Sequence, residues 1–229
     1  MRGLEGRRVV VTGGSSGIGE AAVRRFRDEG ADVVSVALDG EIECDVADAA
    51  QVERAFARVD GLLGGVDVLV ANAGISVRRP FLEIREEEWR RVLDVNLTGV
   101  FLCAQQAARR MVAGGGGVIL MTASTNGLSG HPLYADYNAS KAGVILLART
   151  MALELAPAVR VNAVCPGYVL TPMQQAEYTP EMLAEVDASI PLRRHARPEE
   201  IAALFAFLAS DESAYVTGAA IAIDGGETA

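Results

Sequence analysis

The fold can be inferred from one segment, Thr12-Gly13-Gly14-Ser15-Ser16-Gly17-Ile18-Gly19. A β-branched apolar run (Arg7–Thr12) precedes it and an amphipathic run (Ile18–Glu29) follows it, which is typical of a strand, a turn and a helix. Its glycines allow a sharp turn and a close backbone approach to an anion, and the N-terminus of the helix favours negative charge. The segment therefore predicts a phosphate-binding loop, and a tight turn without a ligand is the alternative.

The same alternation of strand and helix patterns continues along the chain. It predicts an α/β protein with a doubly wound parallel sheet, a Rossmann fold, of about seven strands with helices on both faces. The predicted strands are Arg7–Thr12, Asp32–Leu38, Glu41–Cys44, Val66–Ala71, Val118–Thr122, Val159–Val164 and Ala219–Ile223. The predicted helices are Ile18–Glu29, Ala49–Leu62, Glu86–Val112, Tyr137–Leu155, Pro180–Ser189 and Pro198–Ala209.

The length and composition predict one domain. The chain has 229 residues, half of them hydrophobic, which is enough to bury one large core. No repeat or change in composition marks a boundary, so residues 1–229 are expected to form a single dinucleotide-binding and catalytic domain. The segment 168–197 is bracketed by prolines and holds only a short predicted helix. Long loops at strand carboxyl ends line the ligand crevice of such sheets, and a substrate loop is expected here.

Charge and cysteine usage exclude several classes of partner. The formal net charge of −9 argues against nucleic acids and anionic membranes, which attract basic faces. No apolar run approaches the roughly 20 residues of a membrane span, and Met1–Arg8 has no apolar signal core. The three cysteines are far apart and lack a CxxC spacing, and the two histidines are not spaced as metal ligands with any carboxylate cluster. This pattern predicts free thiols and no metal site. We expect a cytoplasmic protein.

Two titratable residues lie one helical turn apart, Tyr137 and Lys141 in Tyr137-Asn138-Ala139-Ser140-Lys141. A phenol with a pKa of about 10 becomes a useful acid or base near pH 7 at a cost of roughly 4 kcal/mol. One cation about 4 Å away, at an effective dielectric near 20, supplies roughly that much. The spacing thus predicts a tuned proton donor and acceptor. An exposed tyrosine beside a surface lysine is the common alternative for this pattern.

Other polar residues lie at or near the ends of predicted strands, or on a helix that faces the same edge. They are Asn72-Ala73-Gly74, Asn96, Ser124, Pro166-Gly167 and Thr171. Because parallel strands present their carboxyl ends at one edge, we expect these residues to meet in one crevice.

With these segments in order, the chain resembles the short-chain dehydrogenase/reductase family over nearly its whole length. The shared motifs are Thr12-Gly-Gly-Ser-Ser-Gly-Ile-Gly19, Asp45-Val46, Asn72-Ala-Gly74, Asn96, Ser124, Tyr137-x-x-x-Lys141, Pro166-Gly167 and Asp224-Gly225-Gly226. The resemblance implies hydride transfer between a nicotinamide cofactor and a small ketone or secondary alcohol.

The resemblance also implies individual roles. Tyr137 would be the general acid/base, Ser124 would hold the substrate oxygen, Lys141 would lower the pKa of Tyr137 and bind the nicotinamide ribose, and Asn96 would bind a water that relays protons from Lys141. The other implied cofactor contacts are Gly13, Ser15, Ser16, Gly17, Ile18, Gly19, Asp39, Asp45, Val46, Asn72, Ala73, Gly74, Pro166, Gly167, Val169 and Thr171.

The choice of cofactor depends on Asp39, which follows Gly19 by 20 residues. A carboxylate there would bind the ribose hydroxyls of NAD and repel the 2′-phosphate of NADP. Family members that prefer NAD often have this acid two positions earlier, where Ala37 stands. An Asp-Gly turn is the alternative role for Asp39. No basic residue occurs in the glycine loop or at Ala37–Gly40, so NAD is predicted over NADP.

Two other functions remain open. A 3-oxoacyl-carrier-protein reductase using NADPH is the main alternative, although the acidic chain and Met111-Val112-Ala113-Gly114 offer little to an acidic carrier. A catalytically idle dinucleotide-binding regulator is the other. The resemblance implies a homotetramer or homodimer assembled through Glu86–Val112 and Tyr137–Leu155. The residues expected to shape the substrate pocket are Thr125, Asn126, His131, Tyr134, Tyr168 and Met173.

Overall fold

The computed structural model describes residues 1–229 and contains one parallel sheet of seven strands. The strand order is β3-β2-β1-β4-β5-β6-β7. The strands are β1 (Arg8–Thr12), β2 (Asp32–Ala37), β3 (Ile42–Glu43), β4 (Val68–Ala71), β5 (Gly117–Thr122), β6 (Val159–Pro166) and β7 (Ala220–Ile223). The predicted fold class is confirmed.

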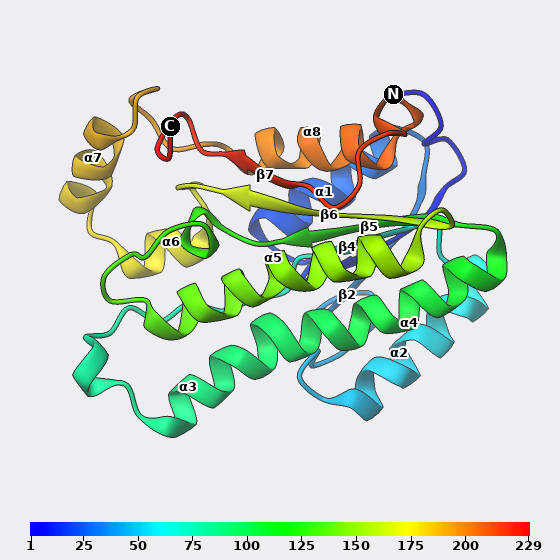
Figure 1. Ribbon diagram of the computed structural model, residues 1–229, viewed down its shortest axis with the longest axis horizontal. Helices are drawn as coiled ribbons and strands as arrows, with labels where there is room; N and C mark the ends of the chain where they lie inside the picture. Colours follow the sequence, from blue (N-terminus) through cyan, green and yellow to red (C-terminus); the bar gives the residue numbers. More distant parts are fainter.

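Helices cover both faces of the sheet (Figure 1). One face packs against α1 (Gly17–Asp28) and α8 (Pro198–Ala209), and the other against α2 (Ala49–Leu63), α4 (Gly99–Gly114) and α5 (Ala135–Leu155). The remaining helices are α3 (Glu86–Leu93), α6 (Pro172–Glu177) and α7 (Pro180–Ser189), with α6 and α7 beyond the strand carboxyl ends.

The apolar sequence of β1 requires helices on both faces of the sheet. Val9 and Val11 join the core cluster under α1 and α8, whereas Val10 between them joins the cluster under α2, α4 and α5. Successive side chains of a strand point to opposite faces. An uninterrupted apolar strand is therefore stable only in a sheet covered on both sides.

The chain reverses its direction of strand addition at β1. After β1 the chain adds β2 and β3 on one side, then crosses over so that β4 pairs with β1 on the other. Such a reversal leaves a crevice at the carboxyl ends of the two central strands. The glycine loop follows β1 and Asn72 follows β4, so both lie at this crevice.

The structure differs from the predicted elements in two places. The expected helix Glu86–Val112 is interrupted by a π-helical turn at Asp94–Thr98, and the helix α6 was not expected.

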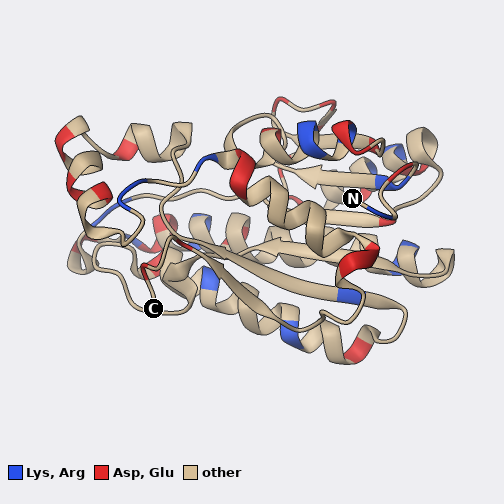
Figure 2. Cartoon of the chain, turned by 90° about the horizontal axis from the view of Figure 1, so that it is seen from above, with Lys and Arg blue, Asp and Glu red and all other residues tan.

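None of the helices combines the length and the apolar character that a membrane span requires. Basic and acidic residues are interspersed along the ribbon (Figure 2).

Candidate active site

Neighbouring backbone atoms leave no space for a side chain at Gly13 and Gly19 of the glycine loop. Gly13 has a φ of 64°, and a Cβ there would lie 2.9 Å from Cα of Ala73. Gly17, the first residue of α1, has a φ of 54°, and a Cβ at Gly19 would overlap the carbonyl oxygen of Gly13. Ser15 and Ser16 are exposed, and the side chain of Ser16 makes no capping hydrogen bond to the helix that it precedes. The helix N-terminus therefore faces an open space with free hydroxyl groups, which suits a phosphate.

Asn72 ties together the carboxyl ends of three strands. Its Nδ2 donates to the carbonyl oxygens of Thr12 and Gly13, each at 3.3 Å, and its Oδ1 accepts from Oγ1 of Thr122 at 3.2 Å. In return, Oγ1 of Thr12 accepts from the backbone N–H groups of Asn72 and Ala73. Asn72 thus holds β1, β4 and β5 in place beneath the crevice.

The crevice contains a pocket of about 390 Å³. Sequence-predicted site residues make up most of its wall. They are Gly13, Ser15, Ser16, Gly17, Ile18, Asp39, Asp45, Val46, Asn72, Ala73, Gly74, Tyr137, Lys141 and Thr171. A Cβ added at Gly74 would lie 3.3 Å from Oδ1 of Asn96 and 3.6 Å from Nζ of Lys141. The absence of a side chain at Gly74 therefore leaves room for a dinucleotide beside Asn96 and Lys141. The hydrogen-bond donors of the pocket wall suit pyrophosphate and ribose groups.

Lys141 and Tyr137 lie on the first turns of α5. Nζ of Lys141 donates to the carbonyl oxygen of Thr122 at 2.7 Å and lies 5.5 Å from the centre of the Tyr137 ring. Burial raises the pKa of Tyr137 to about 12, although a hydrogen bond with Ser124 acts to lower it. Burial lowers the pKa of Lys141 to about 8. Within the protein alone, burial of the phenol outweighs the hydrogen bond with Ser124. The expected lowering of the tyrosine pKa is not produced by these groups themselves.

Ser124 lies two residues after the end of β5 and is buried. Its Oγ accepts a hydrogen bond from the backbone N–H of Asn126 at 3.2 Å, which caps a short 3₁₀ turn at Thr125–Gly127. Ser124 and Tyr137 both line a second, smaller pocket of about 80 Å³ beside the first. Tyr137 and Met173 belong to both pockets.

Asn96 is buried within the π-helical turn. Its Oδ1 accepts from the backbone N–H of Ile75 at 2.8 Å. Its Nδ2 donates to the carbonyl oxygen of Ile75 at 2.9 Å and to Oγ of Ser140 at 3.2 Å. Asn96 lines neither pocket, so it holds the segment after β4 in position. Its role in a water relay stays a prediction.

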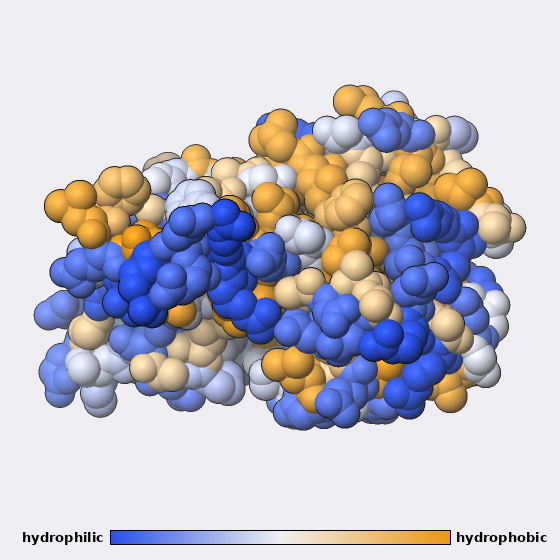
Figure 3. Space-filling model, turned by 90° about the horizontal axis from the view of Figure 1, so that it is seen from below, coloured by the Kyte–Doolittle hydropathy of each residue, from blue (hydrophilic) through white to orange (hydrophobic).

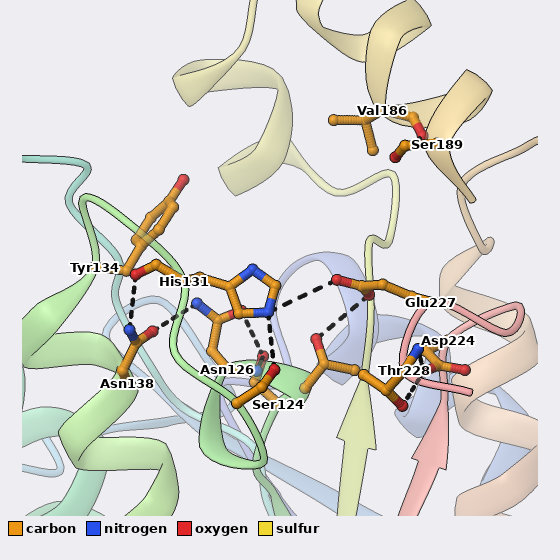
Figure 4. A network of polar contacts seen from close by, with 12 residues as sticks. Ser124, Asn126, His131, Tyr134, Asn138, Val186, Ser189, Asp224, Glu227 and Thr228 are labelled. Atoms are coloured by element: carbon orange, nitrogen blue, oxygen red, sulfur yellow. Dashed lines mark hydrogen bonds and ion pairs between the residues drawn. The ribbon is translucent and has the colours of Figure 1, made fainter.

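The second pocket includes all six residues expected to shape the substrate site, namely Thr125, Asn126, His131, Tyr134, Tyr168 and Met173. Figure 4 shows His131 facing Glu227, with 3.8 Å between Nε2 and Oε1. Asn126 donates to Oδ1 of Asn138 at 2.7 Å on the other side of His131. These contacts order the loop between β5 and α5.

Some predicted residues lie elsewhere, and some lining residues were missed. Gly167 lines the second pocket, while Gly19, Pro166 and Val169 line neither, and their cofactor contacts stay predictions. The lining residues that the sequence analysis missed include Arg91 in the first pocket and Gln174, Glu177 and Tyr178 in the second. Thr171-Pro172 is a helix-start signal, a capping residue followed by proline at the first helical position, and it marks α6, which carries two of them.

A doubly wound sheet with a glycine-rich loop at its reversal point and a Ser-Tyr-Lys set beside it defines a nicotinamide-dependent dehydrogenase or reductase. A family model described as enoyl-(acyl carrier protein) reductase matches residues 13–228. The chain belongs to the short-chain dehydrogenase/reductase family, whose members bind a nicotinamide dinucleotide, and it is an oxidoreductase that acts on carbonyl or alcohol groups.

Similar proteins differ in their substrates. The 3-oxoacyl-[acyl-carrier-protein] reductase of Thermotoga maritima is 41% identical, over 97% of this chain and 98% of its own length. The 3beta-hydroxysteroid dehydrogenase 1 of Eggerthella lenta is 40% identical, over 98% and 95%. Among solved structures, a short-chain type dehydrogenase/reductase from Mycobacterium marinum is 40% identical with a TM-score of 0.93, covering 98% of this chain and 96% of that one. The aldohexose dehydrogenase of Thermoplasma acidophilum is 33% identical with a TM-score of 0.92, covering 98% and 95%.

Proposed function

We propose that the chain transfers hydride between NAD(H) and a small ketone or secondary alcohol, with Tyr137 as the general acid/base. One observation carries the proposal: Tyr137 lines both the pocket behind the glycine loop and the pocket that contains Ser124. A substrate oxygen in the second pocket therefore lies beside a cofactor in the first. The bound nicotinamide supplies or accepts the hydride, and the protein manages the proton.

The phenol is suited first to the role of acid. Because its pKa is raised to about 12, Tyr137 holds its proton at neutral pH and can give it to a carbonyl oxygen during reduction. Ser124 donates a hydrogen bond to the same oxygen, and this bond strengthens as negative charge builds there. For oxidation the phenolate must be stabilised. Lys141, which is protonated below its pKa of about 8, and the positive charge of an oxidised nicotinamide both favour it.

The charges in the first pocket support NAD over NADP. Arg91 and Lys141 are the basic residues in its wall. Arg91 already pairs with Asp45 at 3.3 Å, and Lys141 lies beside Tyr137. Asp39 follows β2 on the same wall and is exposed. A 2′-phosphate at this end would meet a carboxylate with no free cation, whereas ribose hydroxyl groups would find an acceptor.

The Thermotoga relative favours reduction of a 3-oxoacyl group on a carrier protein as the second candidate. Carrier proteins are acidic, and this chain has a net charge of −9, so electrostatic steering opposes their encounter. Reduction of a free 3-oxoacyl thioester with NADPH, but not of a hydroxyl-bearing ketone with NADH, would favour that candidate.

The test of the proposed function is Tyr137→Phe, which removes only the phenolic oxygen. We expect turnover to fall at least a hundredfold, in line with the 10²–10⁴-fold contribution of acid–base catalysis, while the dissociation constant for NADH changes by no more than a few fold. Tyr215→Phe is the matched control, since Tyr215 is fully exposed. More than about a hundredth of the wild-type rate in Tyr137→Phe would show that another group moves the proton.

A further inference from the structure

Two residues that line the second pocket each have a buried polar atom without a hydrogen-bond partner. Nε2 of Gln174 and Oε1 of Glu177 are both buried and unpaired, and both residues line this pocket. They lie three positions apart on α6, so they share one face of that helix. An unpaired buried polar group costs about 1–3 kcal/mol. A molecule that enters the pocket and pairs with both atoms would regain that free energy.

The other atoms around this pair hold Glu177 in position. Oε2 of Glu177 accepts a hydrogen bond from the Tyr134 hydroxyl at 2.9 Å. That hydroxyl also lies 3.1 Å from the Tyr178 hydroxyl. In Figure 4 the Tyr134 ring rises from the loop beside Asn138, away from His131. Because one carboxylate oxygen is fixed by Tyr134, the other is presented as a ready acceptor. The two free atoms thus offer one acceptor and one donor.

Charge selects against an anionic substrate group. The wall of the second pocket includes the carboxylate of Glu177, and Glu227 lies just behind Thr125, with 3.4 Å between Oε2 and Oγ1. Burial lowers the pKa of His131, which keeps this histidine neutral. Arg78 does not line the pocket, since it lies over the outer ring of Tyr178 at 5.5 Å. A phosphate or carboxylate would therefore meet like charge without a compensating cation.

Size and polarity select against a long alkyl chain. The pocket has a volume of about 80 Å³, whereas one water needs roughly 10–15 Å³ on the same measure, so the part of a substrate that it surrounds is small. An alkyl group there would leave Gln174 and Glu177 unpaired. A hydroxyl group is small, neutral, and both a donor and an acceptor.

We infer that the substrate, given the proposed function, is a small neutral polyol or hydroxy ketone whose second hydroxyl group is read by Gln174 and Glu177. This hydroxyl donates to Oε1 of Glu177 and accepts from Nε2 of Gln174, while the reacting oxygen lies between Ser124 and Tyr137. Gln174 and Glu177 are then specificity-determining residues on α6. A site built to hydrogen-bond a substrate hydroxyl strongly rejects the analogue that lacks it.

The experiment compares alcohols that differ by one hydroxyl group. The pairs are 2,3-butanediol with 2-butanol and trans-1,2-cyclohexanediol with cyclohexanol, each oxidised with NAD. We expect kcat/KM of the wild type to be at least tenfold higher for the diol of at least one pair. In Gln174→Leu and in Glu177→Leu this ratio should fall at least tenfold. Gln175→Leu is the matched control, because Gln175 is the exposed neighbour on the same helix, and its ratio should stay within twofold of wild type.

Different results would contradict the inferred substrate class and the proposed function on which it rests. NADH affinity of each variant, measured by nicotinamide fluorescence, reports whether the first pocket is intact. A wild-type ratio near one, no oxidation of either diol, or a ratio that both variants leave unchanged overturns the inference. If instead Tyr137→Phe keeps the wild-type rate on whichever alcohol is oxidised, the proposed function fails. A wild-type ratio near one overturns the inference even if a leucine variant does not fold.

Discussion

Lys141 is a buried cation whose position opposes folding. Its ammonium group is almost fully buried and donates to one carbonyl oxygen, that of Thr122. Burial lowers its pKa from the ordinary 10.5 to about 8. Between these two values the unfolded chain binds more protons than the folded one, so this group makes stability rise with pH through that window. Below pH 8 the full cost is present, and above pH 10.5 it is absent.

The titration of Lys141 predicts a pH-dependent difference in stability. The free energy of unfolding of Lys141→Met, minus that of the wild type, should fall by about 3 kcal/mol as pH rises from 8 to 10.5. Urea unfolding of both proteins across this range measures the difference, and subtraction removes the titration of groups they share. A difference that does not change with pH would show that Lys141 keeps an ordinary pKa when folded.

We predict that Asp39 determines the preference for NAD(H) over NADP(H). We expect kcat/KM to favour NAD(H) over NADP(H) at least tenfold, about 1.4 kcal/mol. Asp39→Ala should narrow this ratio, mainly by weakening NAD(H), because the ribose hydroxyl groups lose their acceptor. Asp32→Ala, an exposed acid at the opposite end of β2, is the matched control. A wild-type preference for NADPH contradicts the assignment, and an unchanged ratio in Asp39→Ala would make the residue only part of a turn.

Residue types and their spacing predicted which residues form part of the site, but not their pKa values or which of their polar atoms lack a partner. The four-residue separation of Tyr137 and Lys141 predicts their shared helix face, and the structure has it. The pKa balance between them depends on how deeply α5 is buried, and no short-range pattern encodes that. Gln174 and Glu177 carry no motif at all. They become notable only because folding leaves one polar atom of each without a partner.

The π-helical turn between α3 and α4 is the element that places Asn96. An extra residue in the turn is a feature often found at functional sites. Asn96→Ala should lower the free energy of unfolding by about 1–3 kcal/mol, because both backbone groups of Ile75 lose their buried partner. It should also weaken NADH binding, since Ile75 and its neighbours line the first pocket.

Urea unfolding and fluorescence titration measure the two effects of Asn96→Ala. Thr98→Ala, at an exposed position of the same turn, is the matched control. A variant with unchanged stability and NADH affinity but a reduced kcat would instead favour the water relay as the main role of Asn96.

Helices and strands were predictable where periodicity is strong. All seven strands lie within one or two residues of the expected ranges, and the central strands β1, β2 and β4 are apolar runs buried on both faces. The π-helical turn was not predictable, since Asp94–Thr98 keeps the apolar spacing of a continuous helix. Helix α6 escaped notice because six residues are too few for a periodic signal.

Exposed apolar side chains on α4 and α5 predict an assembly. Phe101, Leu146 and Leu153 are 41%, 56% and 84% exposed. Figure 3 views the molecule from the side of α3 and α4 and shows hydrophobic residues (orange) between hydrophilic ones (blue). We expect light scattering at micromolar concentration to give a dimer or tetramer. Leu146→Glu/Leu153→Glu should give a smaller species, whereas Leu62→Glu, at an exposed position of α2, should not. A monomeric wild type contradicts this prediction.

The strands β1 and β4 pair in register from Val9 with Val68 to Thr12 with Ala71, so the glycine loop meets Asn72–Gly74 only when the centre of the sheet has formed. A chain unfolded there has no first pocket, and a dinucleotide binds the native state alone. Binding then raises the free energy of unfolding by RT ln(1 + [L]/Kd), about 2.7 kcal/mol at a hundredfold excess over Kd. The melting temperature therefore reports occupancy, and it ranks NAD, NADH, NADP and NADPH as ligands before any substrate is known.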